Sequence, residues 1–432
     1  MTRHAVQGSI FHMLAAPEES GTGHLFEHFE DGLLIIEDGH VAALGPRASL
    51  ESRLPTGTPI TVFGNALIVP GFVDTHIHYP QVDIIAAHGR QLLEWLERYT
   101  FPAEAAFADP EHAREAAAFF LDELLRNGTT TALVFGTVHK GSVDALFAEA
   151  LARNMRLAAG KSMMDRHAPP ELCDTAQASY DDSRALISAW HGKGRLGYAV
   201  TPRFAGTSSP EQLTLASRLL DEFPDVLLQT HLSENRAEVD WIRTLFPEAK
   251  DYLNVFERFG LVRDRSVFAH GVHLDEDAFG RLLRARAALA FCPTSNLFLG
   301  SGLFDLRTAR QLNVKLGLGT DVGGGTSFSL WQTMNEAYKV GQLRDFALEP
   351  LEAFYMATLG GARALRLDDK IGNLEPGKEA DFLVLDRKAT PLLARRLAHC
   401  RSIEEQIFVL SILGDDRVIA RTYLAGTLAH TR

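Results

Sequence analysis

The sequence has few cysteines, no excess of positive charge and no long apolar run, and each shortage excludes a class of protein. Its three cysteines, Cys173, Cys292 and Cys400, lie far apart in 432 residues and form no C-x-x-C pair. This spacing indicates neither a disulfide framework nor a thiolate zinc site. Reduced cytosol is therefore the expected compartment.

Charge and hydropathy exclude two further classes of partner. Lys and Arg number 43 against 55 Asp and Glu, a formal net charge of -12, which disfavours a general attraction to nucleic acid or to an anionic membrane. No apolar run reaches the roughly 18 residues of a membrane-spanning helix, and the first residues lack a cleavable apolar signal. We expect a cytoplasmic protein with a small neutral or cationic ligand, and with neither a nucleic-acid nor a membrane partner.

Both ends of the chain are typical of β structure. Residues 32–45 contain two short apolar runs separated by Asp-Gly, a signal for a hairpin turn. Near the other end, residues 380–386 and 418–427 are expected to form strands.

Between the ends, short apolar runs alternate with longer amphipathic stretches, the pattern of repeated βα units. Eight runs are expected to be strands: 66–74, 129–135, 155–160, 195–201, 226–231, 266–270, 287–292 and 314–321. Helices are expected between them, for example at 111–126, 211–222, 275–286 and 329–344. Eight alternations favour a closed TIM-type (β/α)₈ barrel. A doubly wound open sheet is the alternative, but the glycine-rich phosphate-binding motifs of such sheets are absent.

This pattern predicts an α/β chain with two domains. The barrel is expected to span residues 66–367. Residues 1–65 and 368–432 are expected to combine into one small discontinuous β-sandwich domain.

Polar residues recur where the expected strands end, which is where TIM barrels place catalytic groups. His76 and His78 are two residues apart on the first strand, so both imidazoles lie on one face. Three later strands end in His231, His270 and Asp321. Any one such histidine is more simply explained as structural, but five polar residues at four strand ends are hard to explain by packing. Imidazole and carboxylate ligands suit zinc or ferrous iron, with an open position for water.

A carboxylate near such a metal can carry a proton from water to substrate. Glu234, three residues after His231, and Asp321 are the candidates. Glu234 has a structural alternative, because acidic residues are favoured in the first turn of a helix.

These residues resemble the amidohydrolase superfamily, and the resemblance covers nearly the whole chain. It is carried by PGFVDTHIH at 70–78, by the histidine and aspartate strand ends, and by ADFLVLD at 380–386. Further blocks resemble the guanine deaminases of this superfamily, especially the bacterial form: YPQ at 79–81, QLLEWLERYTFP at 91–102, TPRF at 201–204, THLSEN at 230–235, PTSNLFLGSG at 293–302 and GTDVGGG at 319–325.

The resemblance implies hydrolytic deamination of guanine to xanthine and ammonia by a metal-activated water, with one zinc ion per subunit or iron in its place. The implied metal ligands are His76, His78, His231 and Asp321. The implied catalytic residues are Glu234 as proton shuttle, Asp321 as base, and His270 as a further ligand or an acid/base partner.

The same resemblance assigns guanine binding to three residues and makes a homodimer the expected assembly. Gln81 has an amide that donates and accepts, Arg203 has paired planar donors, and Phe204 offers an apolar face. Lys161, after the third strand, is in the place of the carboxylated lysine of two-metal relatives. The deaminase branch does not use one, so we expect a single metal and a structural Lys161.

Two alternatives remain open. A related amidohydrolase with the same metal site would act on another aminated ring, such as 8-oxoguanine, a pterin, or a triazine or hydroxy-atrazine type compound. A non-catalytic scaffold on the same barrel would be expected to have lost its ligands. The cytidine-deaminase fold is excluded, because H-x-E paired with P-C-x-x-C is absent.

Overall fold

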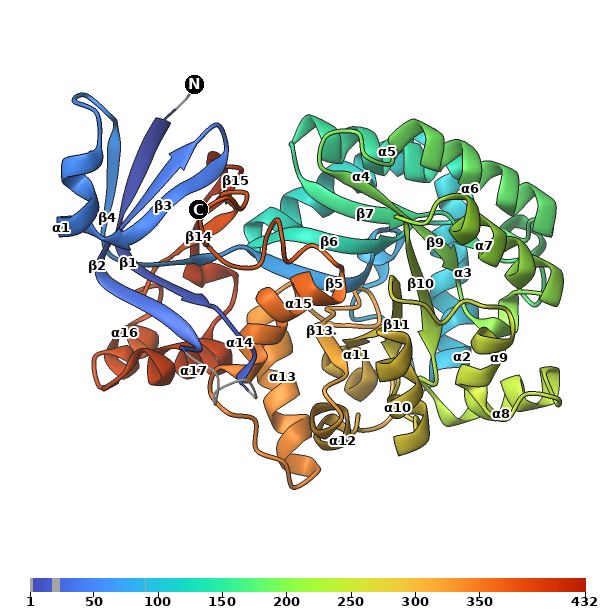
Figure 1. Cartoon of the computed structure of the whole chain (residues 1–432). Coiled ribbons are helices and arrows are strands. Elements are labelled where there is room, and N and C mark those ends of the chain that lie inside the picture. The colour runs from blue at the N-terminus through green and yellow to red at the C-terminus, as the bar shows by residue number, and fades with distance from the viewer. Residues whose placement is uncertain (1–2, 18–23, 90) are drawn as a thin grey trace.

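The computed structural model describes residues 3–17, 24–89 and 91–432, so part of the expected 1–65 segment, residues 1–2 and 18–23, lies outside the described chain. Two separate sheets form its framework (Figure 1). The larger is a nearly closed barrel of parallel strands, and the expected TIM-type fold is confirmed. In sheet order its strands are β5 (Phe72–His78), β6 (Thr129–Phe135), β7 (Arg156–Gly160), β9 (Leu196–Pro202), β10 (Leu227–Leu232), β11 (Ser266–His270), β12 (Ala288–Phe291) and β13 (Lys315–Leu318), with the short β8 (Ser162–Met163) paired to β9.

The barrel closes where its first and last strands meet. The Thr75 hydroxyl donates to the carbonyl of Leu318 at 2.9 Å. Beyond the end of β13, the Asp321 amide donates to the carbonyl of His76, also at 2.9 Å. Strand closure therefore brings Asp321 directly beside the two histidines of β5.

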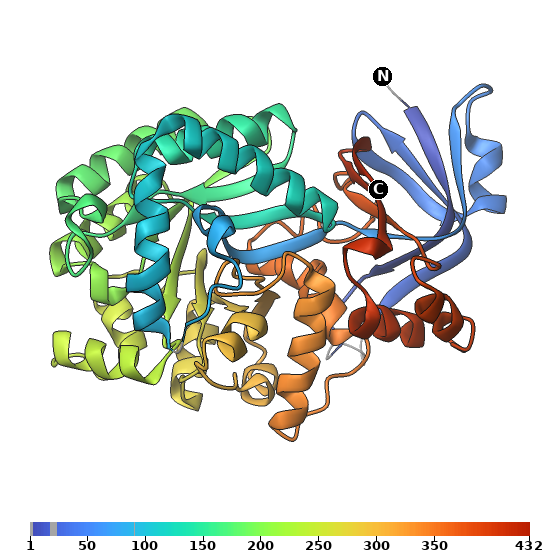
Figure 2. The same ribbon diagram turned by 180° about the vertical axis from the view of Figure 1, so that it is seen from behind.

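Helices surround the barrel (Figures 1 and 2). The larger ones are α4 (Pro110–Arg126), α5 (Lys140–Ala152), α6 (Ala176–Trp190), α7 (Pro210–Glu222), α8 (Arg236–Leu245), α9 (Tyr252–Arg258), α10 (Glu276–Ala285) and α13 (Leu330–Leu343). The shorter ones are α2 (Leu92–Trp95), α3 (Phe101–Ala105), α11 (Pro293–Phe298), α12 (Leu306–Gln311), α14 (Glu352–Met356) and α15 (Leu359–Ala364). The four helices expected from periodicity are confirmed as α4, α7, α10 and α13. Three of them begin at a side-chain cap, as at Asp109, whose carboxylate accepts from the Glu111 amide.

The smaller sheet joins the two ends of the chain and lies to one side of the barrel (Figure 2). In sheet order it contains β16 (Thr427–Thr431), β15 (Ile419–Leu424), β14 (Phe382–Leu385), β4 (Ile60–Pro70), β1 (Arg3–Met13), β2 (Phe26–Glu37) and β3 (His40–Pro46), with α1 (Arg47–Leu50), α16 (Pro391–Leu397) and α17 (Ile403–Leu413) in its connections. The expected hairpin is confirmed between β2 and β3. Its turn residues, Asp38 and Gly39, have positive φ angles of 45° and 83°, which the Asp-Gly pair tolerates.

One strand boundary differs from the expectation. The run 66–74 is divided at Gly71 between β4 in the small sheet and β5 in the barrel. A Cβ at Gly71 would lie 2.1 Å from the Thr130 hydroxyl, so glycine is required where the chain passes between the sheets. Both halves are buried and apolar, and periodicity alone does not show that they belong to different sheets. The domain limits at 65 and 367 remain predictions.

Within the described residues, no helix combines the length and the apolar character needed to cross a membrane.

Candidate active site

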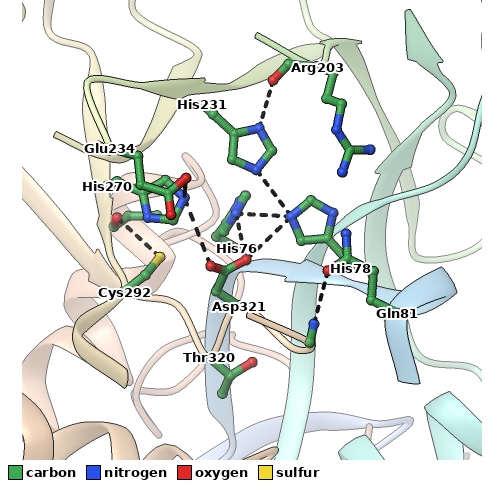
Figure 3. Close-up of polar contacts among 12 residues, drawn as sticks. His76, His78, Gln81, Arg203, His231, Glu234, His270, Cys292, Thr320 and Asp321 are labelled. Carbon is green, nitrogen blue, oxygen red and sulfur yellow. Dashed lines mark hydrogen bonds and ion pairs between the residues drawn. The ribbon is translucent and has the colours of Figure 1, made fainter. Parts of the chain in front are cut away.

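Five polar side chains from four strands meet at the carboxyl end of the barrel (Figure 3). His76 and His78 belong to β5, His231 to β10, and His270 is the last residue of β11. Asp321 follows β13 by three residues. The sequence-predicted cluster is thus brought together; four of its members are buried, and His231 is partly buried.

The possible ligand atoms of this cluster lie within a few ångströms of one another. The Nε2 atom of His78 is 3.3 Å from that of His76 and 3.2 Å from that of His231. The Oδ1 atom of Asp321 is 3.1 Å from His76 Nε2 and 3.3 Å from His78 Nε2. Counting His270, the ligand atoms of His76, His231, His270 and Asp321 all lie within 4.8 Å of each other.

Hydrogen bonds at the Nδ1 atoms, which face away from the cluster, orient the rings of His231 and His270. His231 Nδ1 is 2.7 Å from the backbone oxygen of Arg203, which can only accept, so Nδ1 carries the proton. His270 Nδ1 is 2.9 Å from the side-chain oxygen of Asn296. The Nε2 lone pairs of both rings consequently face the cluster, and His270 Nε2 is buried without a hydrogen-bond partner. Converging lone pairs repel one another unless a cation lies between them, so the donor set fits a metal ion.

Burial also sets the protonation of the cluster. Removal from water lowers the pKa of His76, lowers that of His78 to about 3, and lowers that of His231 well below its ordinary value. Burial alone would raise the pKa of Asp321, but the charge and hydrogen bonds of the facing histidines hold it well below its ordinary value. At neutral pH His76, His78 and His231 therefore present neutral imidazoles beside one carboxylate, which suits zinc or ferrous iron.

Glu234 lies beside the cluster with its carboxyl group pointing into it (Figure 3). Its Oε2 atom is 3.4 Å from His270 Nε2, and its Oε1 atom accepts a 3.3 Å hydrogen bond from Ser301. Burial, reinforced by the charges of Asp321 and Glu238, raises the pKa of Glu234 well above its ordinary value. A carboxyl group that keeps its proton near neutral pH can act as a general acid.

Glu234 does not lie in the first turn of a helix, which was the structural alternative for this residue. Asn235 is the N-cap of α8, and Glu238 is the acidic residue of the first turn. The Glu238 carboxylate accepts from the backbone amides of Glu234, at 2.9 Å, and Asn235, at 3.1 Å. Glu234 precedes the helix, which frees its side chain to face the cluster.

A small cavity adjoins the cluster, and two of the three predicted substrate-binding residues line it. Its walls are formed by Arg203, Phe204, His231, Glu234 and Glu238, together with Leu92, Leu93 and Leu96 above them. Its volume is about 30 Å³. Gln81 is not among the lining residues. Its amide nitrogen donates to Glu104 at 3.1 Å, and its amide oxygen accepts from the Gly323 amide at 3.2 Å.

Comparison with known proteins identifies the family to which the chain belongs. The model of the amidohydrolase family matches residues 67–429. The chain belongs to the amidohydrolase family. The guanine deaminase of Escherichia coli (strain K12) is 53% identical over 100% of this chain and 98% of its own. The probable guanine deaminase of Deinococcus radiodurans is 43% identical over 99% and 98% of the two chains.

Solved amidohydrolase structures show the same similarity in three dimensions. E. coli guanine deaminase matches with a TM-score of 0.97 at 52% identity, covering 99% of this chain and 100% of that one. The guanine deaminase of C. acetobutylicum, solved with guanine bound in its active site, matches with a TM-score of 0.89 at 28% identity over 99% of each chain. The resemblance to guanine deaminases predicted from the sequence is confirmed.

Lys161, the residue that in two-metal amidohydrolases would be carboxylated, has another partner here. Its side chain is fully buried, and its ammonium group forms an ion pair with Asp174. Asp174 also accepts a 3.1 Å hydrogen bond from Ser179 at the start of α6. These contacts support the predicted structural role of Lys161.

Sequence reasoning missed several residues that hold this amidohydrolase site in place. Glu104 contacts both Arg203 and Gln81, but it lies 99 positions from Arg203 and outside the motif blocks. Asn296 and Ser301 fall inside the block at 293–302, whose sequence does not indicate a role for each of its members. Asp74 was part of the strand-end motif, and the fold shows it accepting from the backbone amides of His76 and Thr320, both at 3.1 Å.

Proposed function

We propose that this chain is a hydrolytic deaminase that converts guanine and water to xanthine and ammonia. The observation that carries the proposal is the intact cluster with Glu234 beside it, in a chain 53% identical over its full length to E. coli guanine deaminase.

The proposed cofactor is one zinc ion per subunit, with iron as the alternative. The proposed ligands are His76, His78, His231 and Asp321. His270 Nε2 faces the same point and either binds the ion or contacts the reacting water. When bound, such an ion supplies a Lewis acid that lowers the pKa of water toward neutrality.

The two carboxyl groups divide the proton transfers. Asp321, which is ionised, takes one proton from the attacking water as its oxygen forms a bond to C2 of guanine. Glu234, which is protonated, donates its proton to the adjacent ring nitrogen N3, so that C2 becomes tetrahedral without leaving charge on the ring. The opposed pKa shifts of Asp321 and Glu234 favour these roles.

Collapse of the tetrahedral carbon returns both carboxyl groups to their starting states. The bond from C2 to the exocyclic amine breaks, and the amine takes the proton held by Asp321 and leaves as ammonia. The hydroxyl proton on C2 returns to Glu234 as the carbonyl of xanthine forms. The sum of these steps consumes one water and no other reactant.

The ring would be held by the predicted substrate residues. Arg203 offers planar donors for the O6 and N7 acceptors of guanine, and Phe204 offers an apolar face. Gln81 would act from behind Arg203, because its amide is already bonded to Glu104 and Gly323.

The test is turnover by the purified protein with its metal quantified. Guanine loss and xanthine formation are followed by ultraviolet absorbance, with adenine, cytosine, 8-oxoguanine and ammeline as parallel substrates. Chelation should abolish activity and added zinc should restore it. Glu234→Gln should lower kcat at least about a hundredfold, because general acid catalysis contributes about that much, whereas Glu111→Gln, on the exposed first turn of α4, should match the parent.

Each outcome has a defined meaning. Fastest turnover of guanine, about one metal per chain and an inactive Glu234→Gln protein would support substrate and mechanism together. Preference for another ring with metal bound would overturn guanine as the substrate. A protein that binds no metal would overturn the enzymatic proposal. The homodimer and the cytoplasmic location stay predictions, and light scattering after size exclusion tests the first.

A further inference from the structure

A fully buried carboxylate connects two of the proposed guanine-binding residues. Glu104 is on α3, Arg203 directly follows β9, and Gln81 is in the turn after β5. The Arg203 Nη1 atom donates to both oxygens of Glu104, at 2.8 and 2.7 Å. The Gln81 amide nitrogen donates to the first of these oxygens at 3.1 Å.

The arrangement fixes the orientation of both partners. Because Glu104 only accepts, it holds the nitrogen end of the Gln81 amide, while the Gly323 amide holds the oxygen end. Glu104 engages only the Nη1 corner of the Arg203 guanidinium, and no side chain in the described part of the chain forms a hydrogen bond with its Nε or Nη2 atom. Those donors remain available to a planar acceptor in the cavity that Arg203 lines.

The ion pair between Glu104 and Arg203 neutralises a buried charge as well as holding the arginine in place. Arg203 and Glu104 are both buried, at 2% and 0% exposure, and a buried guanidinium without a counter-charge is strongly unfavourable. The Phe101 ring also lies near the guanidinium, with its centroid 5.9 Å from Cζ, but it carries no charge. Without Glu104, Arg203 would therefore be expected to move toward solvent or toward another carboxylate.

We propose that Glu104 is the positioning residue for guanine specificity: together with Gln81, which binds the same carboxylate, it fixes Arg203 so that the remaining donors of Arg203 face the O6 edge of the purine. The inference rests on the proposed function, because it concerns recognition of the same substrate. It assigns Glu104 no contact with the reacting atoms.

Glu104→Gln is the most direct variant. The new amide must place its NH₂ group where one carboxylate oxygen now accepts, and both oxygen positions face donors. Arg203 is then displaced. Hydrogen bonds to charged groups contribute about 1.5–3 kcal/mol, so guanine affinity should fall about ten- to a hundredfold.

The experiment measures binding rather than turnover, in the Glu234→Gln background, which holds substrate without converting it. Dissociation constants are determined for guanine and for 2-aminopurine, which lacks O6 and is fluorescent. Glu104→Gln should weaken guanine by the stated factor and 2-aminopurine by less than about threefold, because only guanine uses the O6 contact. In the otherwise unmodified enzyme the same change should raise KM for guanine more than it lowers kcat.

Two further variants control for a merely structural effect. Glu379→Gln makes the same change in a partly buried carboxylate that pairs with Arg156, at the start of β7, and with Arg195, just before β9; neither residue lines the cavity. It should lower the melting temperature without altering the ratio of the two dissociation constants. Glu104→Asp keeps the charge but shortens its reach, and should give an intermediate ratio if Glu104→Gln does not fold.

The inference is overturned if guanine and 2-aminopurine weaken equally, or if the ratio is unchanged in both Glu104 variants. Metal content measured on each protein separates these results from loss of the ion. Failure of the proposed function is a different result: the parent protein would not deaminate guanine, whatever Glu104 does.

Discussion

Asn296 determines which nitrogen of His270 carries a proton. Its side-chain oxygen lies 2.9 Å from His270 Nδ1, and both residues are buried. An acceptor at this position keeps the proton on Nδ1 and leaves the Nε2 lone pair for the metal or the reacting water.

Removal of this acceptor should weaken the site without disturbing the fold. Asn296→Ala is expected to lower metal affinity or kcat about ten- to a hundredfold, the usual cost of losing such a supporting partner. Asn296→Asp retains the acceptor and should lose less. Metal titration and steady-state kinetics measure both effects, and equal losses in the two variants would contradict the role assigned to the hydrogen bond.

Asp74 makes the stability of the metal-free protein depend on pH. Burial raises its pKa to about 7 from 3.8, although the Thr320 hydroxyl and two backbone amides donate to it. The folded state therefore binds the Asp74 proton more tightly than the unfolded state does. The protonated carboxyl group makes its full contribution to the free energy of unfolding below pH 3.8, and this contribution is lost as the pH rises through 7.

Asp74→Asn should remove that dependence. The measurement compares parent and variant after a chelator has removed the metal. The difference in unfolding free energy, parent minus variant, should fall by up to about 1.4 kcal/mol per pH unit between roughly pH 5 and 7 and then level off. Urea titrations at several pH values measure the difference, in which the other titrating groups cancel. A difference that is flat across this range, or that rises with pH, would contradict the raised pKa.

Among individual residues, those at strand ends could be predicted from the sequence, whereas contacts between residues far apart in the chain could not. The convergence of His76, His78, His231 and Asp321 was predictable because each lies near or just beyond the carboxyl end of a strand, and parallel strands end at the same rim. Glu104 was not, because its partners come from three segments that only the folded barrel brings together. Gln81 is predicted to bind substrate, but the structure places it outside the cavity wall, since its amide is turned toward Glu104.

At the scale of elements, residues 91–105, here called the covering segment, close the cavity. Leu92, Leu93 and Leu96 line it, and its volume of about 30 Å³ accommodates about one or two water molecules. Guanine is larger than that space, so we predict that the covering segment moves when substrate enters. The Gln91 side-chain oxygen, which accepts from Asn235 at 3.0 Å, connects the segment to the residue after Glu234.

Gln91→Ala should shift the covering segment toward its open state. A single hydrogen bond contributes about 1 kcal/mol, which corresponds to roughly a fivefold change in that equilibrium. Because only the open state admits guanine, KM should fall by up to a similar factor. Hydrogen–deuterium exchange should become faster at residues 92–105. Gln177→Ala, which removes an exposed bond to Asp181 on α6, is the matched control. Unchanged exchange in the covering segment would show that this bond does not hold it.

Element positions were more predictable than their membership in a sheet. The strands and helices of the barrel followed from apolar periodicity and from caps such as Asp109. The run at 66–74 did not reveal its division at Gly71, because a change of sheet leaves the apolar pattern intact. The π-helical turn Leu96–Thr100 in the covering segment also has no signal in the apolar spacing.

At the scale of the whole molecule, a buried ionic contact joins the small sheet to the barrel. Arg195, just before β9, pairs with Glu379 at 2.7 Å and also with Asp381, and Glu379 pairs with Arg156 at the start of β7. The Asp381 carboxylate also accepts from the Ala425 amide at 2.7 Å. The two arginines lie at the amino ends of barrel strands, whereas the histidine cluster lies at the carboxyl ends.

Asp381→Ala should therefore destabilise the protein while leaving its chemistry intact. Removal of one member of a buried pair leaves Arg195 incompletely neutralised and typically costs about 3–5 kcal/mol, with the bond to Glu379 keeping the loss toward the lower figure. Urea unfolding measures this loss, and kcat per folded molecule at 25 °C should match the parent. Asp240→Ala removes an exposed pair with Arg243 and should cost less than about 1 kcal/mol. Equal stability of Asp381→Ala and Asp240→Ala would show that the ADFLVLD segment does not hold the two sheets together; a selective loss of kcat would instead show that the small sheet acts on the site through the barrel.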